Sequence, residues 1–223
     1  MNQNQLIWVD EQDTIIGYGT KLETHRLEQL HRAYSIFLYD NEEQKMLLQK
    51  RADGKYHSGG LWSNACCSHP YKDENWGQAI QRGLQNELGL SLALAASGTP
   101  VRFIAKFQYY SSYGELSEHE MDYVFLFLAD PAQIALITPN PDEIAAIQWM
   151  TLEEIEQLLL HSPELFTSWF PQAYQIARKA LTECTDRGNL VRQKDSDKKS
   201  ADTTTRKSFS KRYENHLKPQ QSI

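Results

Sequence analysis

Five side chains that bind divalent metals well fall in three stretches of this sequence. His25 and His31 lie near the N-terminus, His69 lies in the middle, and Glu118 and Glu120 lie two residues apart. In an extended chain, a spacing of two places both carboxylates on one face. Imidazole with carboxylate suits Mn²⁺ or Zn²⁺, whereas Mg²⁺ prefers sites made only of oxygen ligands. Spacing alone leaves a second interpretation open, because His and Glu also scatter over protein surfaces.

A cysteine next to one of these groups could exchange protons with a substrate. Cys67 lies two residues before His69, so the two side chains share a face if this segment is extended. A thiol needs a partly exposed, electropositive setting to exchange protons, and a bound metal would supply one. The competing interpretation is that Cys67 is a small buried apolar residue, which is the commoner fate of a free cysteine.

Basic residues lie close in sequence to the same groups. Lys21 precedes His25, Arg51 comes just before a polar, glycine-containing loop at 53–60, and Lys55 lies within that loop. Such cations suit a diphosphate, which Arg binds with two hydrogen bonds and Lys binds as a point charge. Taken alone, they are better explained as ordinary solvated Lys and Arg at a strand end, since these residue types are usually exposed.

The elements that must position these residues are predicted from periodicity and from turn signals. Alternating or continuous apolar runs predict strands, and a period near 3.6 predicts helices over Asn75–Leu88, from Thr151, and over Glu164–Leu181. The predicted strands are Leu6–Val9, Ala33–Tyr39, Lys45–Lys50, Val101–Tyr110, Met121–Leu128 and Ile144–Met150, with a turn-rich segment at Ser111–Glu118. Strands and helices mixed without a regular βαβ period favour an α/β sandwich with a mixed sheet.

Length and charge predict one catalytic domain, 1–184, followed by a polar, disordered basic tail, 185–223. The tail has ten basic and five acidic residues, so its net charge is +5 and that of the preceding body is −11, for a total of −6. An acidic body argues against nucleic-acid binding. Three cysteines make no disulfide framework, and neither a signal peptide nor a membrane span is found, so we expect a cytoplasmic protein.

The stretch from Ser68 to Leu90, SHPYKDENWGQAIQRGLQNELGL, resembles the Nudix box. The positions in register are Glu74, Arg82, Leu84, Glu87, Gly89 and Leu90. The positions that depart from the box are Ser68, Gly83 and Asn86, where the box has a glycine and two glutamates. Nudix hydrolases bind Mg²⁺ with those carboxylates, so a hydrolase built on this box would be short of metal ligands.

Further motifs resemble type I isopentenyl-diphosphate Δ-isomerase, over about residues 5–183. They are LWSNACCSHP at 61–70, SEHEMDY at 117–123 and SWF at 168–170, together with the two early histidines. The resemblance implies a Nudix-type α/β/α sandwich and a metal held by His25, His31, His69, Glu118 and Glu120. It implies a catalytic pair, Cys67 and Glu120, assisted by Tyr109 and Trp169. It also implies diphosphate binding by Lys21, Arg51 and Lys55, with a Mg²⁺ carried by Glu87. Many relatives have a second Arg after Arg82, where this chain has Gly83.

The function implied is the interconversion of isopentenyl and dimethylallyl diphosphate through a tertiary carbocation, in isoprenoid biosynthesis. The expected cofactors are Mg²⁺ on the diphosphate and Mn²⁺, Zn²⁺ or Mg²⁺ at the His/Glu site. The expected partner is a small-molecule substrate, with neither nucleic acid nor membrane. Two alternatives remain: a Nudix hydrolase of a nucleoside diphosphate or related compound, and a catalytically inactive Nudix-like module that binds a metal or a partner.

Overall fold

A computed structural model of the chain describes residues 4–55, 57–91 and 101–183. The chain divides into a compact unit, Met1–Arg178, and a second unit that begins at Lys179. Of the second unit only 179–183 are described, and these residues are helical. The tail predicted at 185–223 lies outside the described residues. None of the helices in the described ranges is long and apolar enough to cross a membrane.

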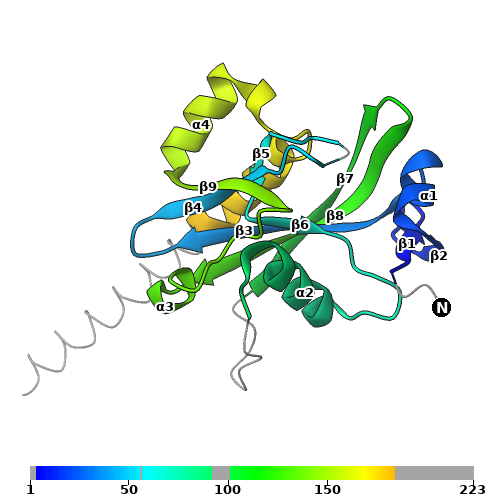
Figure 1. Cartoon of the computed structure of the whole chain (residues 1–223), viewed down its shortest axis with the longest axis horizontal. Coiled ribbons are helices and arrows are strands. Elements are labelled where there is room, and N and C mark those ends of the chain that lie inside the picture. The colour runs from blue at the N-terminus through cyan, green and yellow to red at the C-terminus, as the bar shows by residue number, and fades with distance from the viewer. Residues whose placement is uncertain (1–3, 56, 92–100, 184–223) are drawn as a thin grey trace, which may run out of the picture. The chain divides into compact units, whose positions relative to one another are not determined.

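One mixed sheet of nine strands organises the first unit (Figure 1). Its path runs β2-β1-β3-β4-β5, with β6 and β8 also paired to β3, β7 paired to β8, and β9 paired to β4. The strands are β1 (Leu6–Val9), β2 (Ile15–Gly19), β3 (His31–Asp40), β4 (Lys45–Arg51), β5 (Trp62–Asn64), β6 (Cys66–Ser68), β7 (Val101–Tyr113), β8 (Leu116–Ala129) and β9 (Ile144–Thr151).

Strand β3 is the centre of this sheet and brings distant parts of the chain together. It runs parallel to β8, in a register that places His31 opposite Glu120. On its other side it pairs antiparallel with β6, which places Ser35 opposite Cys67. Because paired residues point to the same face and side chains alternate along a strand, one surface of the sheet gathers the side chains of His31, Ala33, Ser35, Cys67, Glu118, Glu120 and Asp122.

The helices begin and end at recognisable caps. Helix α2 (Trp76–Leu88) begins at a capping box formed by Asn75 and Gln78 and ends at Gly89, whose φ of 66° is left-handed. Thr151 caps α4 (Leu152–His161), as its sequence predicts. The remaining described helices are α1 (Lys21–Arg26), α3 (Pro131–Ile134), the 3₁₀ turn η1 (Pro163–Leu165) and the helical segment from residue 170.

Alternation along β3 divides the core into two layers. Tyr34, Ile36 and Leu38 face the buried side of α2 on one surface of the sheet. Phe37 faces the opposite way, where its ring lies 6.0 Å from that of Phe170. Helices therefore cover both faces of the sheet, and the predicted α/β/α sandwich with a mixed sheet is confirmed (Figure 1).

Two predicted elements were wrong at their boundaries. The segment predicted as turn-rich, Ser111–Glu118, is mostly strand, because β7 and β8 form one long hairpin around Gly114, whose φ is 73°. Glu118 and Glu120 therefore lie within β8. The last helix begins at Phe170 instead of Glu164, since Pro171 is tolerated only in a first helical turn. The polar side chains at 111–118 are typical of a turn, but strand pairing here depends on backbone hydrogen bonds and does not require apolar side chains.

Candidate active site

A cavity of about 300 Å³ opens on the site-bearing face of the sheet. Its lining includes ten of the twelve residues that the sequence predicted for the site: Lys21, Arg51, Lys55, Cys67, His69, Glu87, Tyr109, Glu118, Glu120 and Trp169. The other two, His25 and His31, are buried directly beside it, with ligand nitrogens within 4.8 Å of one another and of His69. The structure thus brings the whole predicted set into one place.

Hydrogen bonds to backbone carbonyls orient two of the three clustered histidines. His25 donates Nδ1–H to the carbonyl of Ser117 at 2.9 Å, and His31 donates Nδ1–H to Gln29 O at 2.8 Å. Since a carbonyl only accepts, the Nε2 of each ring keeps its lone pair. Burial lowers the pKa of His25 to about 3 and that of His69 to about 4, so both rings are neutral at neutral pH. Neutral imidazoles are the form that binds a metal.

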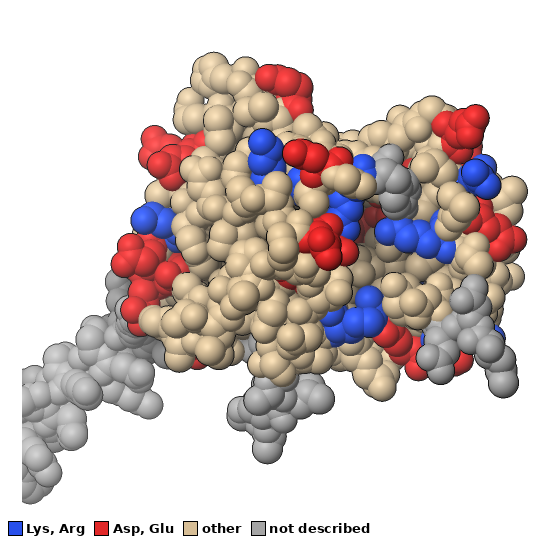
Figure 2. All heavy atoms as spheres, viewed as in Figure 1, with Lys and Arg blue, Asp and Glu red and all other residues tan. Residues whose placement is uncertain are grey.

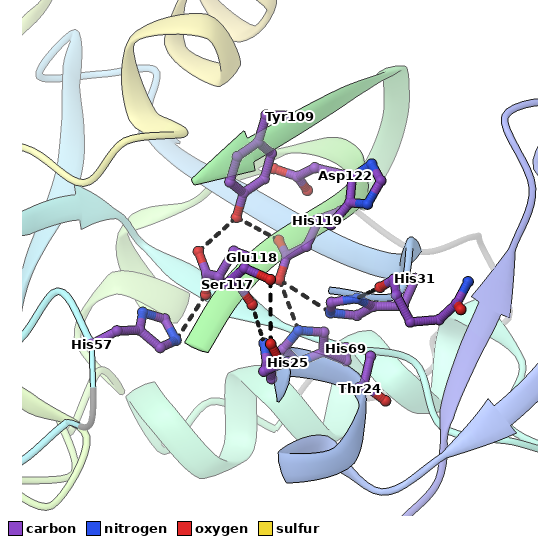
Figure 3. Close-up of polar contacts among 12 residues, drawn as sticks. Thr24, His25, His31, His57, His69, Tyr109, Ser117, Glu118, His119 and Asp122 are labelled. Carbon is purple, nitrogen blue, oxygen red and sulfur yellow. Dashed lines mark hydrogen bonds and ion pairs between the residues drawn. The ribbon is translucent and has the colours of Figure 1, made fainter. Parts of the chain in front are cut away.

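Two carboxylates complete this donor set and are linked through one tyrosine. The Tyr109 hydroxyl lies 2.9 Å from Glu118 Oε2 and 2.6 Å from Glu120 Oε2. Glu120 Oε1 lies 2.9 Å from His69 Nε2 and 3.5 Å from His31 Nε2. Burial alone would raise the pKa of Glu120, but these two histidines outweigh it and hold the pKa well below its usual range. In Figure 3, His25, His31 and His69 lie together beside Glu118, with Tyr109 on the other side of the carboxylates. Three imidazoles and two carboxylates fit a divalent first-row metal.

The two adjacent cysteines lie on opposite faces of the sheet. Cys66 packs in the core beneath α2 and is fully buried. The Cys67 thiol faces the cavity and donates to Asn64 Oδ1 at 3.1 Å, with Ser63 Oγ at 3.5 Å. Burial, together with the Glu87 carboxylate, raises the pKa of Cys67 to about 12. In the metal-free protein, Cys67 is therefore a protonated thiol that reaches the cavity.

Basic side chains line the cavity. Figure 2 shows Lys and Arg gathered about a hollow in the face viewed, with acidic side chains between them. The guanidinium of Arg51 lies 5.4 Å from the centroid of the Trp169 ring, and Lys55 pairs with Glu143. Arg82, which was not assigned to the site from sequence, also lines the cavity and is held by Glu74 at 2.7 Å. The cavity can therefore attract an anion inside a body of net negative charge.

Glu87 reaches the same cavity from α2. Its Oε2 accepts from Gln49 Nε2 at 2.9 Å and from the Cys67 backbone N–H at 3.4 Å. Burial raises its pKa to about 7, from an ordinary 4.5. A carboxylate so close to its ionisation point near neutral pH binds a cation readily once the cation compensates the cost of burying its charge.

This raised pKa predicts a pH-dependent stability. Between pH 4.5 and 7 the unfolded chain releases a proton that folded Glu87 retains, so the stability of the fold falls as pH rises through this window. Without metal, we expect Glu87→Gln to match the wild type near pH 4.5. Near pH 8 the variant should be more stable by up to about 3 kcal/mol. Urea unfolding at both pH values measures this difference, and equal stabilities near pH 8 would contradict it.

Several residues of the site escaped the sequence-based assignment. His57 contacts Glu118, Asn64 receives the Cys67 thiol, Gln49 orients Glu87, and Ser35 donates to the buried Asp122 at 2.8 Å. Asn64 lies in the quoted LWSNACCSHP motif, which was a usable signal. A single His in a polar loop, or a Gln in a strand, carries no local pattern that marks it as part of a site.

The departure of the box at Gly83 has a structural cause. A Cβ at this position would lie 2.3 Å from the Tyr34 hydroxyl and 3.2 Å from Cys66 Sγ. That hydroxyl is itself fixed by a 2.6 Å hydrogen bond to Ala79 O. Neither the box glutamate nor a second arginine fits here without moving Tyr34, and Arg82 is the basic residue that α2 contributes to the cavity lining.

We expect Gly83→Ala to destabilise the protein by about 1–3 kcal/mol, because the methyl group overpacks this contact. Gly77→Ala on the same helix is the matched control, since its Cβ would meet only Asn75 Oδ1, at 3.3 Å. The control should be neutral or slightly stabilising, as alanine favours a helix over glycine. Urea denaturation of both variants measures the difference, and a Gly83→Ala variant as stable as the wild type would refute the packing argument.

Comparison with known proteins agrees with this fold. Residues 29–170 match the NUDIX domain family. Among solved structures, a Deinococcus radiodurans protein superposes with a TM-score of 0.57 at 19% identity, covering 78% of this chain and 98% of that one. A MutT Nudix hydrolase from Burkholderia pseudomallei superposes with a TM-score of 0.50 at 19% identity, covering 66% and 98%. At these identities the two structures show a shared fold.

The family match spans more than half of the chain, which therefore belongs to the Nudix family. Similar curated proteins indicate which group within the Nudix family this chain belongs to. The isopentenyl-diphosphate Delta-isomerase of Photobacterium profundum is 40% identical over 183 residues, covering 81% of this chain and 97% of the relative. That of Pectobacterium atrosepticum is 41% identical over 171 residues, covering 76% and 89%. Within the Nudix family, the chain belongs to the type I isopentenyl-diphosphate Δ-isomerases.

Proposed function

We propose that this enzyme interconverts isopentenyl diphosphate and dimethylallyl diphosphate by protonation and deprotonation through a tertiary carbocation, with Cys67 and Glu120 as the proton-transferring pair. The observation that supports this most directly is that one cavity is lined by a thiol, a tyrosine-linked carboxylate and several cations. Double-bond migration needs an acid and a base that act on one small unit. A diphosphate substrate needs the cations.

Lys21, Arg51 and Lys55 are the proposed diphosphate ligands, and Glu87 would hold a Mg²⁺ that supplies further positive charge to the diphosphate. The five donors of the His/Glu cluster (His25, His31, His69, Glu118, Glu120) would hold a second divalent metal. When bound, that metal would neutralise buried carboxylate charge and so make the Glu120 carboxyl a stronger acid.

In the forward direction, Glu120 gives a proton to the terminal alkene carbon, and Cys67 removes a proton from the carbon on the other side of the cation. The Tyr109 hydroxyl shares its one proton between the two carboxylates and lies closer to Glu120 (2.6 Å) than to Glu118 (2.9 Å), so it holds Glu120 in place for this transfer. In the reverse direction the thiol is the donor and the carboxylate the acceptor. The raised pKa of Cys67 favours a thiol and the lowered pKa of Glu120 favours a carboxylate, which is the combination that the reverse direction uses.

A carbocation without a stabilising heteroatom must be shielded from water. Trp169 is buried in the cavity wall, and its indole N–H points to Asn64 Oδ1 at 3.3 Å, which fixes the orientation of the ring. We propose that its π face stabilises the cationic carbon. Its distance of 5.4 Å from the Arg51 guanidinium is consistent with this, because the ring already lies next to one cation.

Proton NMR of the metal-loaded protein with isopentenyl diphosphate in D₂O tests this function. We expect dimethylallyl diphosphate to form with deuterium incorporated from the solvent. Release of inorganic phosphate or pyrophosphate would indicate a hydrolase instead. An unchanged substrate with folded, metal-loaded protein would refute the proposed reaction.

A further inference from the structure

His57 is a fourth buried histidine at this site, and the proposed reaction gives it no role. It lies on the loop between β4 and β5, and its Nε2 is 2.8 Å from Glu118 Oε1, with both side chains about 5% exposed or less. Its ring stacks on Tyr113 at 5.1 Å and meets the Trp169 ring edge-on at 6.5 Å. Figure 3 shows it on the side of Glu118 away from His31 and His69.

The hydrogen bonds separate His57 from His25 and His31. His69 also contacts a carboxylate through Nε2, at 2.9 Å from Glu120 Oε1, but its ligand nitrogen lies in the cluster with those of His25 and His31. An ionised carboxylate only accepts hydrogen bonds, so the Nε2 of His57 carries the proton that it shares with Glu118. His25 and His31 instead use Nδ1–H on backbone carbonyls and keep the lone pair on Nε2. His57 is also not among the histidines whose ligand atoms lie within 4.8 Å of one another. Its geometry is that of a group that orients a ligand.

The contact between His57 and Glu118 is the first of a series of contacts that leads through Tyr109 to Glu120. Glu118 Oε1 accepts from His57, and Glu118 Oε2 accepts from Tyr109, whose hydroxyl continues to Glu120. A carboxylate held at both oxygens has little freedom to rotate away from the metal position. Orienting contacts of this kind typically change metal affinity by about 10- to 100-fold.

The backbone of His57 connects the same residue to the cationic side of the cavity. Arg51 Nη2 donates to His57 O at 3.4 Å, and Lys55 lies two residues earlier on the same loop. The β4–β5 loop carries Lys55 and begins directly after Arg51, and both are proposed diphosphate ligands. The His57 side chain connects this loop to Glu118, a proposed metal ligand. An ordered Glu118 would favour the loop position in which Arg51 and Lys55 line the cavity.

We propose that His57 is a positioning residue that holds Glu118 in its metal-ligating orientation and couples metal binding at the His/Glu cluster to diphosphate binding by the β4–β5 loop. This inference rests on the proposed function for the roles of Glu118, Arg51 and Lys55. It concerns ligand binding alone, so it can be tested without any isomerase assay.

The test compares His57→Leu, which keeps apolar bulk but cannot donate, with His57→Gln, whose amide can still donate to Glu118. His119→Leu is the matched control, because His119 lies between the two carboxylates on β8 but contacts Gln108 and Glu28 on the other face. Calorimetric titration of each protein with Mn²⁺, and with inorganic pyrophosphate before and after loading with Mn²⁺, measures both affinities and the gain that the metal gives.

We expect His57→Leu to bind Mn²⁺ about 10- to 100-fold more weakly, and to lose most of the gain in pyrophosphate affinity that Mn²⁺ gives the wild type. His57→Gln and His119→Leu should stay close to the wild type. The inference is overturned if His57→Leu binds Mn²⁺ as the wild type does, if His57→Gln is as weak as His57→Leu, or if the wild type binds no Mn²⁺. Should His57→Leu fail to fold, His57→Phe takes its place, because it can keep the ring stacked on Tyr113 but cannot donate to Glu118, and the same outcomes apply.

The two proposals fail separately. A wild type that shows this Mn²⁺ and pyrophosphate pattern but leaves isopentenyl diphosphate unchanged refutes the isomerase function and supports the coupling. An active wild type whose His57→Leu variant binds Mn²⁺ normally refutes the coupling alone.

Discussion

Replacement of Cys67 by alanine should lower kcat by about 10³-fold or more, since a positioned acid or base contributes about 10²–10⁴ to a rate and no other thiol among the described residues reaches the cavity. The KM for isopentenyl diphosphate should change little, because the proposed diphosphate ligands are untouched. Steady-state kinetics with Mg²⁺, together with solvent deuterium exchange into the substrate, measures the loss.

The adjacent cysteine provides the control for this variant. Cys66 points into the core on the opposite face of the sheet, so Cys66→Ala should keep kcat and lose about 1–2 kcal/mol of stability by leaving a small cavity. Comparing the Cys67→Ala and Cys66→Ala variants separates the effect of losing a catalytic thiol from the effect of losing a packed side chain. Normal turnover by Cys67→Ala, or an equal loss of turnover by both variants, would refute the assignment of Cys67.

The second large effect is expected at Glu120. Glu120→Gln removes the proposed acid and one oxygen ligand at once, so turnover should fall by about 10³–10⁴-fold. Mn²⁺ affinity should fall as well, because an amide is a weaker ligand for this set than a carboxylate. Kinetics and Mn²⁺ titration of the same preparation measure the two effects together.

Glu115→Gln is the matched control for Glu120, because Glu115 lies exposed in the turn of the same β7–β8 hairpin. It should leave both turnover and metal affinity unchanged. If Glu120→Gln lost metal affinity but kept its turnover with saturating Mn²⁺, Glu120 would be a metal ligand without a role in proton transfer, and the proposed mechanism would need another acid.

The sequence by itself determined what depends on local rules. The spacing of two between Glu118 and Glu120 predicted a shared face, and Tyr109 indeed bonds both carboxylates. Asn75, Gly89 and Thr151 predicted the ends of helices, because caps are set by a few neighbouring residues. The quoted motifs also identified the family, because those segments carry the side chains of the cavity.

Only the tertiary structure decided which segments meet and which way they face. The parallel pairing of β3 with β8 places His31 opposite Glu120, and the pairing of β3 with β6 turns Cys67, not Cys66, toward the cavity. Tyr34 fills the space beside Gly83, and the β4–β5 loop brings His57 to Glu118. These contacts join residues far apart in the chain, so their geometry is set by sheet register and core packing. Neither leaves a periodic or local signal in the sequence.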